Sequence, residues 1–540
     1  MSFLDFDPHN YKYSSRRPVT YGTRGMVATS QPLAAQAGLD ILKKGGNAVD
    51  AAIATAAALV VTEPTGCGLG SDAFALIWKD GKLHGLNSSG FSPSSFSEKI
   101  FDSEFFPRGW SSVTVPGVVA AWAELAKKMG RLHFSDTLAP AIDLASRGFA
   151  VTPVIAELWQ KAFNTFKDFK APEFNSWLKT FCPNGRAPKA GEIFRSQPLA
   201  RTLRRIAEAG GEDFYKGDLA EKIITFSNKT NGFFKPEDFS SFKPEWVNPI
   251  SINYRGFDIW ELPPNGQGIC VLIALNILKN FEFEKDSRDD FSTYHKQIEA
   301  IKIAFSIAKK YVSDPKFNDI PIENLLENIL NEDYASELAK KIDFNKATDF
   351  DKSENFGGGT VYLTTADSGG SMVSYIQSNF MGFGSGVVIP ETGISLNNRA
   401  SCFSKNPDSP NFVSGRKRPY NTIIPAFITQ NNKPLGTFGV MGGFMQPQGH
   451  VQVVMNLIDF KMNPQEALDA PRWKWNHDLQ VSIEPNFPEI QAQKLSQSGH
   501  EIINENNSLD FGRGEIIIKT EYNSLAGASE PRADGQVAAW

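Results

Sequence analysis

The spacing of apolar residues divides the chain into helix-forming and strand-forming stretches. Residues 30–44 place apolar side chains every three to four positions, with Ser30 as the expected cap and two glycines as the stop. The next stretch, Ala48–Val61, is largely alanine and predicts a second helix, which Pro64 ends. Because alanine side chains are small, we expect this helix to lie close against a sheet.

Strand patterns follow the helical ones. Ala73–Trp78 and Leu83–Asn87 flank an Asp-Gly pair and predict a hairpin, and Thr360–Ala366 and Ser371–Ser378 predict another. The remaining predicted elements are helices over 117–129, 138–148, 269–279, 294–312 and 451–459, and strands over 25–29, 250–262, 436–441, 479–483 and 515–520.

Antiparallel hairpins with helices before and after them predict a four-layer α-β-β-α sandwich, an α/β (α+β) fold. Residues 151–211, rich in Phe, Lys and Pro, are interpreted as a helical excursion on the outside. The polar, acidic residues 343–355 predict an exposed linker that leads into a glycine-rich stretch.

Composition narrows the classes of function. With 55 basic and 60 acidic residues, well mixed, the chain has a net charge of −5, which argues against a nucleic-acid partner. Residues 1–25 lack the apolar core of a signal peptide, and the longest apolar run, Ala51–Val61, is too short to span a membrane. We therefore expect a cytoplasmic protein.

Metal and cofactor motifs are not apparent in the sequence. The four cysteines are far apart and match no metal-binding spacing, so we expect neither metal nor cofactor. Cys67 lies in a glycine-rich loop without a basic neighbour in the sequence, and we interpret it as a small buried residue rather than a nucleophile.

The stretch Gly357-Gly358-Gly359-Thr360 joins a flexible segment to a strand. If the Gly359–Thr360 bond were cut, Thr360 would carry a free α-amine beside its hydroxyl. Such an amine titrates near pH 7.7–8.0, roughly, and can act as the base for its own hydroxyl. Taken alone, the stretch is better explained as an ordinary glycine-rich turn before a strand.

Many short motifs in one order resemble the γ-glutamyltranspeptidases. They extend over nearly the whole chain: Gly25–Thr29, Gly45–Ala52, Glu63–Gly66, Val115–Gly117, Pro263–Gly266, Leu396–Asn398, Lys417–Pro419, Met441–Gly443 and Ala467–Arg472. The resemblance implies an N-terminal-nucleophile hydrolase whose precursor cleaves itself before a threonine, here Thr360.

The resemblance also implies the roles of individual residues. Cleavage between Gly359 and Thr360 would yield a large subunit, 1–359, and a small subunit, 360–540, which stay associated as one intertwined catalytic domain. The backbone amides of Gly442 and Gly443 would form the oxyanion hole. Ser378 would orient the nucleophile, and Asn379 is a candidate substrate contact.

The pocket for the acyl group departs from the family pattern. Ser89 stands where typical members carry an arginine for the substrate α-carboxylate. Cys402 takes the place of the acidic residue that holds the α-amino group, and Asn421-Thr422 replaces a Ser-Ser pair. Arg399 could bind a carboxylate from another side or form a structural ion pair.

Three functions remain open at this stage. The first is a self-cleaving amide hydrolase or acyltransferase that acts on γ-glutamyl compounds such as glutathione through an acyl-enzyme. The second keeps this mechanism for a glutaryl-type acyl amide, similar to the cephalosporin acylases. The third is an uncleaved, inactive binding protein with the same fold, since Val361-Tyr362 replaces the usual Thr-His after the nucleophile.

Overall fold

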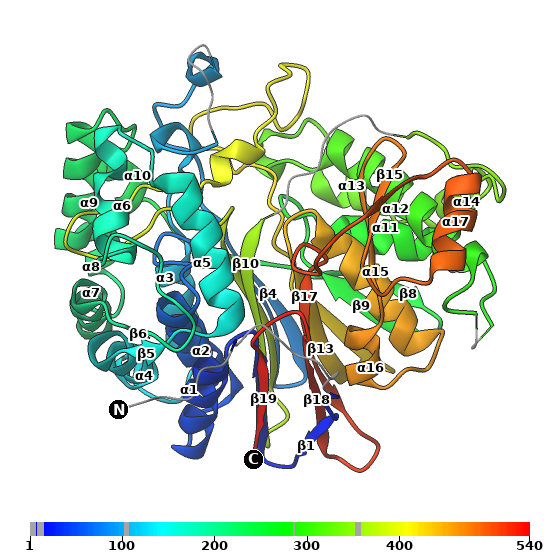
Figure 1. The fold of residues 1–540 in the computed structure, drawn as a ribbon, viewed down its shortest axis with the longest axis horizontal. Coiled ribbons are helices and arrows are strands. Elements are labelled where there is room, and N and C mark those ends of the chain that lie inside the picture. The colour runs from blue at the N-terminus through cyan, green and yellow to red at the C-terminus, as the bar shows by residue number, and fades with distance from the viewer. Residues whose placement is uncertain (1–6, 8–15, 102–106, 285–286, 351–357) are drawn as a thin grey trace.

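Two antiparallel sheets of seven strands each form the centre of the computed structural model, which describes residues 7, 16–101, 107–284, 287–350 and 358–540 (Figure 1). In spatial order, the first sheet contains β1 (Thr20–Gly22), β18 (Leu525–Ser529), β17 (Arg513–Lys519), β13 (Lys433–Met441), β12 (Ala426–Gln430), β9 (Phe257–Glu261) and β8 (Ile250–Tyr254). The second contains β19 (Gln536–Ala539), β2 (Gly25–Thr29), β10 (Gly359–Asp367), β11 (Met372–Phe380), β3 (Asp72–Lys79), β4 (Lys82–Ser88) and β7 (Glu245–Val247). The predicted hairpins and the four-layer sandwich are confirmed.

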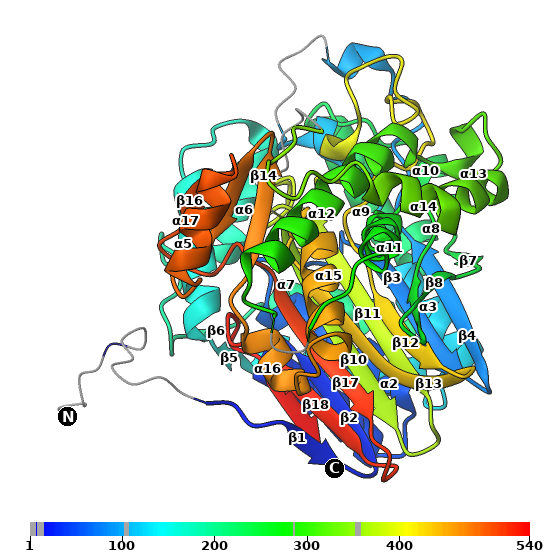
Figure 2. The ribbon, with the colours of Figure 1, turned by 90° about the vertical axis from the view of Figure 1, so that its right-hand side faces the viewer.

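Helices cover the outer face of each sheet (Figure 1). Those on the side of β10 are α1 (Pro32–Lys43), α2 (Ala48–Thr62), α3 (Val118–Met129), α4 (Phe134–Arg147), α5 (Pro153–Phe166), α6 (Asn175–Phe181), α7 (Gln197–Glu208), α8 (Asp213–Lys216), α9 (Asp218–Lys229) and α10 (Pro236–Ser240). On the side of β13 lie α11 (Gly268–Leu278), α12 (Phe291–Tyr311), α13 (Ile322–Ile329), α14 (Glu332–Ala339), α15 (Met445–Ile458), α16 (Pro464–Asp469) and α17 (Glu489–Gln497). Figure 2 shows α15 lying along the sheet that holds β12 and β13.

Smaller sheets complete the structure. β14 (Trp473–His477), β15 (Gln480–Ile483) and β16 (Glu501–Asn504) form one, and β5 (Phe149–Ala150) pairs with β6 (Ile193–Phe194). Among the described residues, no helix is long and apolar enough to cross a membrane.

The alanine-rich helix α2 is fully buried, as its composition predicts. Every residue from Ala48 to Thr62 is buried, and α2 packs against β10 and β11 on one side and against α1 and α4 on the other. Asn47 and Asp50 form a reciprocal capping box at its first turn. The helix therefore packs against β10 with little side-chain volume between them.

The predicted cap of the first helix is wrong by one residue. Gln31 is the cap, and its side chain accepts hydrogen bonds from the amides of Leu33 and Ala34. Ser30 instead donates its hydroxyl to Glu63, 2.5 Å away, at the end of α2. A tertiary contact therefore takes the hydroxyl that local sequence assigns to the cap.

Candidate active site

Thr360 lies at the start of β10, and its side chain is buried. Its hydroxyl is 3.1 Å from the hydroxyl of Ser378 on the neighbouring strand β11. The Ser378 hydroxyl donates to the carbonyl oxygen of Gly359 over 2.8 Å, and it accepts a bond from the amide of Phe380 over 2.7 Å. Ser378 therefore connects the expected nucleophile to the carbonyl of the bond expected to break.

A β-bulge creates this arrangement. Gly359 pairs with Phe380 and Val361 with Gln377, so that two residues of β11, Ser378 and Asn379, lie opposite Thr360 alone. Phe380 closes the bulge with a φ of 77°, which is unusual for a residue with a bulky side chain. The bulge turns Ser378 toward both Thr360 and Gly359.

Gly357, the first glycine of the stretch, lies outside the described residues, as do residues 351–355 of the expected linker.

β10 and β13 face each other across the two sheets, and this brings Gly443, one of the two predicted oxyanion glycines, next to the segment that precedes Thr360. The hydroxyls of Thr364 and Thr437 are hydrogen-bonded, and Tyr362 packs directly against Gly439. Gly358, just before β10, lies close to Gly443, just after β13. A Cβ added at Gly358 would be 3.2 Å from the Cα of Gly443 and 3.4 Å from its nitrogen. The backbone amide of Gly443 therefore lies next to the segment that carries the Gly359 carbonyl.

Gly442 and Gly443 connect β13 to α15 with φ angles of 143° and 61°. Both angles favour glycine. Gln267 stabilises this turn, because its side-chain amide donates to the carbonyl of Gly443 over 2.9 Å and to that of Thr422 over 2.6 Å. Gln267 follows directly on the motif Pro263–Gly266, which is the signal that could have identified it.

His450 of α15 fixes the end of β13 just before the two glycines. Its Nε2 accepts the amide of Val440 over 3.0 Å, so the ring proton lies on Nδ1, which donates to Glu261 over 2.8 Å. Burial, together with the charge of Arg472, lowers the pKa of His450 to about 3. The ring is therefore neutral and positions the strand that leads to the predicted oxyanion glycines.

Arg399, Asn421 and Thr422, which lie where the sequence departs from the family pattern, form one buried polar cluster with Asp72. Arg399 Nε is 3.0 Å from Asp72, and both side chains are 0% exposed. Arg399 Nη1 donates to the Thr422 hydroxyl over 2.8 Å, and the Asn421 amide donates to Asp72 over 3.1 Å. The amide of Gly90 donates to the second oxygen of Asp72 over 2.9 Å.

Asp72 is a member of this cluster that the sequence analysis did not single out. Asp72 is the first residue of the apolar strand β3 and follows the loop that begins at the family motif Glu63–Gly66. This position is the signal that could have identified it. Burial raises the pKa of Asp72, while Arg399 opposes that shift. The carboxylate oxygens of Asp72 are occupied by Arg399, Asn421 and Gly90, so it is not an open acceptor for a substrate ammonium.

Arg399 has one unused hydrogen-bonding group. Its guanidinium lies over the ring of Phe380, with its central carbon 4.8 Å from the ring centroid, and its Nη1 is 3.9 Å from Cys402 Sγ. Nη2 is buried and has no hydrogen-bond partner within the part of the chain that the structure describes. A buried guanidinium nitrogen without a partner is costly, and a substrate carboxylate would satisfy it.

Ser89 and Asn379 are oriented toward other protein groups. The Ser89 hydroxyl donates to Asn87 over 2.7 Å. The carbonyl oxygen of the Asn379 side chain accepts the Ser71 hydroxyl over 2.9 Å, and its nitrogen is 3.4 Å from Ser395. The structure therefore brings Thr360, Ser378, Gly359 and Gly443 together, whereas the Asn379 side chain extends into the loop that precedes β3.

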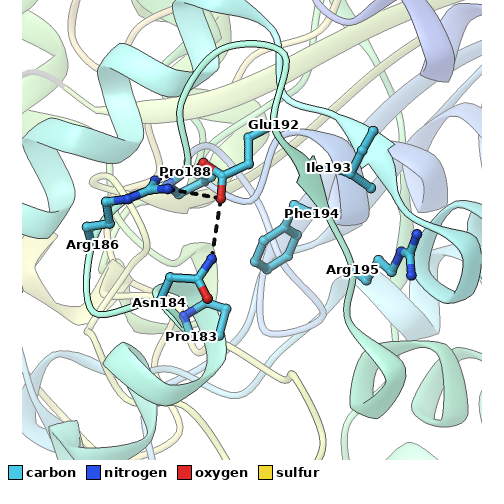
Figure 3. Close-up of a pocket in the computed structure, with 8 residues that line it drawn as sticks. All are labelled: Pro183, Asn184, Arg186, Pro188, Glu192, Ile193, Phe194 and Arg195. Carbon is cyan, nitrogen blue, oxygen red and sulfur yellow. Dashed lines mark hydrogen bonds and ion pairs between the residues drawn. The ribbon is translucent and has the colours of Figure 1, made fainter. Parts of the chain in front are cut away.

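A pocket of about 310 Å³ opens beside Gly358 and Gly359. Its wall includes Thr65, Arg108, Phe166 and Gly382. Figure 3 shows a different hollow, lined by Pro183–Arg195 and bridged by an Arg186–Glu192 ion pair of 2.8 Å. That hollow shares no lining residue with the pocket beside Gly359, so it is separate from the candidate active site.

One buried cluster contains metal-ligand types. Ligand atoms of His295, Glu299 and His500 lie within 4.8 Å of one another. The Lys302 ammonium is 2.8 Å from Glu299 and already supplies the positive charge at this point. We therefore interpret the cluster as a structural ion-pair network.

Cys67 is also buried, and burial raises the pKa of its thiol well above the usual range.

Known proteins resemble this chain over almost its full length. The family model described as Gamma-glutamyltranspeptidase matches residues 34–540. The glutathione hydrolase-like YwrD proenzyme of Bacillus subtilis is 36% identical over 528 residues, covering 95% of this chain and 98% of that protein. The glutathione hydrolase proenzyme of Escherichia coli is 31% identical over 554 residues, covering 96% and 93%.

A solved structure shows the same similarity. The crystal structure of cephalosporin acylase from Bacillus halodurans matches with a TM-score of 0.94 and 54% identity, covering 99% of both chains. Fold and comparisons together define an N-terminal-nucleophile amide hydrolase. Within that class, the chain belongs to the γ-glutamyltranspeptidase family.

Proposed function

We propose that the chain cleaves itself between Gly359 and Thr360 and that the new N-terminal Thr360 then hydrolyses acyl amides. The position of Ser378 between the Thr360 hydroxyl and the Gly359 carbonyl carries this proposal. Because Ser378 donates to Gly359 and accepts from Phe380, the Thr360 hydroxyl is left to donate toward Ser378. This network orients the Thr360 oxygen beside a polarised carbonyl.

Self-cleavage would proceed in two balanced steps. The Thr360 oxygen attacks the Gly359 carbonyl carbon and gives its proton to the Thr360 nitrogen, the C–N bond breaks, and an ester joins Gly359 to the Thr360 side chain. Water then hydrolyses the ester, which frees the Gly359 carboxylate and the Thr360 α-amine. The fragments 1–359 and 360–540 stay associated, since β10 pairs with β2 and β3 with β11 inside one sheet.

In the mature enzyme, Thr360 acts on a second amide. Its oxygen attacks the substrate carbonyl, and its α-amine takes up the proton and delivers it to the leaving amine. The backbone amides of Gly442 and Gly443 stabilise the oxyanion. Water, or a second amine, then removes the acyl group from Thr360.

For the substrate, we propose an acyl group that ends in a carboxylate and needs no α-amino group, as in glutaryl amides. The unpartnered Nη2 of Arg399 is a donor for that carboxylate. Cys402 supplies no charge for an ammonium group, and Asp72 is saturated by other donors. γ-Glutamyl amides remain the second candidate, favoured by the relatives that are named glutathione hydrolases.

Two measurements test these proposals. Intact mass and N-terminal sequencing should find two fragments, the smaller starting at Thr360, and a Thr360→Ala chain should stay whole. The processed enzyme should then cleave glutaryl p-nitroanilide with a higher kcat/KM than γ-glutamyl p-nitroanilide. A wild-type chain that stays uncut would favour the inactive binding protein, and the opposite substrate order would favour γ-glutamyl compounds.

A further inference from the structure

Gln267 connects the turn at Gly443 to the polar cluster around Arg399. Its side chain is 0% exposed, and its amide nitrogen donates both of its hydrogens, one to the carbonyl of Thr422 and one to that of Gly443. Its carbonyl oxygen accepts the hydroxyl of Tyr420 over 3.1 Å. Each polar atom of the side chain is therefore engaged, and the planar amide is held in one orientation.

Three hydrogen bonds in a row lead from Arg399 to Gly443. Arg399 Nη1 donates to the hydroxyl of Thr422 over 2.8 Å. The carbonyl of the same threonine accepts the Gln267 amide over 2.6 Å, and that amide also donates to the carbonyl of Gly443 over 2.9 Å. The backbone of Gln267 is fixed as well, because its amide donates to the carbonyl of Asn421 over 3.0 Å. Gln267 therefore sets the separation between Thr422 and Gly443.

The two ends of this row are the groups proposed to bind the two ends of the acyl group. Nη2 of Arg399, which has no hydrogen-bond partner among the described residues, is the proposed donor for the terminal carboxylate. The backbone amides of Gly442 and Gly443 are the proposed donors for the carbonyl oxygen. The number of methylenes in an acyl group fixes the distance between its carboxylate and its carbonyl. Only a chain of matching length can therefore reach both sets of donors while its carbonyl stays in position for attack.

We propose that Gln267 is a positioning residue that selects the length of the acyl chain, because it holds the carboxylate donor and the oxyanion amides at a fixed separation. This inference rests on the proposed hydrolysis of carboxylated acyl amides at Thr360. It adds a determinant of specificity that acts through Thr422 and Gly443 and needs no contact with the substrate.

Acyl amides of different length test the inference. Succinyl, glutaryl and adipyl 4-nitroanilide differ only in their number of methylenes. We expect the processed wild type to favour the glutaryl amide in kcat/KM by about 10- to 100-fold over the other two, as for a misplaced methylene in a fitted site. Gln267→Met keeps the approximate length of the side chain but removes its hydrogen bonds, and it should reduce this preference to about threefold or less.

Gln452 of α15 provides the matched control. It is a buried glutamine whose amide nitrogen also bridges two backbone carbonyls, those of Gln448 over 3.2 Å and Trp473 over 3.0 Å. Gln452→Met should therefore lose comparable contacts but keep the wild-type preference for chain length. If Gln267→Met lowers the rates for the three amides equally and keeps the preference, its role is purely structural and the inference is overturned.

Pentanoyl 4-nitroanilide, which lacks the terminal carboxylate, separates chain length from charge. Gln267→Met should still favour the glutaryl over the pentanoyl amide, because Arg399 keeps its donor for the carboxylate. Loss of that preference would show that Gln267 supports Arg399 alone, and the proposed control of chain length would be wrong.

Binding of free dicarboxylates makes the test independent of turnover. In calorimetry, processed wild type should bind glutarate about 10-fold or more tightly than succinate or adipate, and Gln267→Met should bind the three with nearly equal affinity. Unchanged selectivity in Gln267→Met, or no binding of dicarboxylates to the wild type, would refute the inference. If the variant loses the selectivity of the wild type but neither protein cleaves an amide, the result counts against the proposed function alone.

Discussion

The hydroxyl of Ser378 donates a hydrogen bond to the carbonyl oxygen of Gly359 over 2.8 Å. Ser378 is one of the two bulged residues of β11, and Gly359 carries the carbonyl that the proposed self-cleavage would attack. The same hydroxyl lies 3.1 Å from the hydroxyl of Thr360, so a single side chain contacts both the proposed nucleophile and the carbonyl that we propose it attacks. This geometry is present in the uncut chain, where it is needed.

Replacing Ser378 by alanine should therefore slow self-cleavage. Loss of one donor to a developing oxyanion costs about 10²- to 10³-fold in rate. Gel densitometry of freshly purified chain over time would give the rate constant. Ser378→Thr keeps the hydroxyl and should process at nearly the wild-type rate, and equal rates for Ser378→Ala and wild type would show that Ser378 has no part in cleavage.

The spacing of apolar residues along the chain predicts much of the fold, but it does not predict the contacts that form the candidate site. The alanine run of α2 and the hairpin of β10 and β11 depend on local patterns, so they could be predicted. The ion pair of Asp72 and Arg399 joins residues 327 positions apart, and no local pattern specifies such a partner. The bulge at Ser378 also depends on the register of two strands, which the sequence leaves open.

Most residues of the candidate site were predicted from the resemblance to the γ-glutamyltranspeptidase family. Thr360, Ser378 and Gly443 meet because β10 and β13 face each other from two sheets, which is a property of the whole fold.

Breaking the buried ion pair should destabilise the fold. Arg399→Met leaves the Asp72 carboxylate buried with only neutral donors, at a cost of about 3–5 kcal/mol in the free energy of unfolding. Adding Asp72→Asn removes the unpaired charge and should recover part of that loss. Urea unfolding in a Thr360→Ala background, which keeps the chain uncut, would measure both, and two additive losses would contradict the direct coupling.

Gly442→Ala should separate substrate hydrolysis from self-cleavage. The φ of 143° disfavours a side chain, and the new Cβ would lie 3.1 Å from the Cα of Gly512. We expect the turn to shift and the kcat/KM for an anilide substrate to fall by about 10²-fold, while cleavage at Gly359, aided by Ser378, continues.

A glycine remote from the site provides the control for that prediction. Gly499 has a φ of 101°, and a Cβ there would meet only the Cβ of Ala347, at 3.8 Å. Gly499→Ala should lower stability by about 1–2 kcal/mol without changing kcat/KM. Equal effects of the two substitutions on catalysis would mean that strain, rather than the oxyanion site, explains the loss at Gly442.

Acidification should destabilise the protein through its buried histidines. Burial, with Lys302 and His295 nearby, lowers the pKa of His500 to about 2, whereas an unfolded histidine titrates near pH 6.5, roughly. Between these values the unfolded chain binds the extra proton. The contribution of His500 to stability is therefore complete above about pH 6.5 and is lost as the pH falls toward 2.

His500→Gln should flatten this pH dependence. A glutamine nitrogen can take the place of Nε2, which lies 2.9 Å from His295, but it does not titrate. The drop in unfolding free energy from pH 7 to pH 5 should shrink by about 2 kcal/mol, at about 1.4 kcal/mol per pH unit below 6.5. Urea unfolding of the uncut Thr360→Ala chain at both pH values measures the drop. His133→Gln, at an exposed position before α4, should leave it unchanged, and an unchanged drop in His500→Gln would show that His500 is protonated in the folded state.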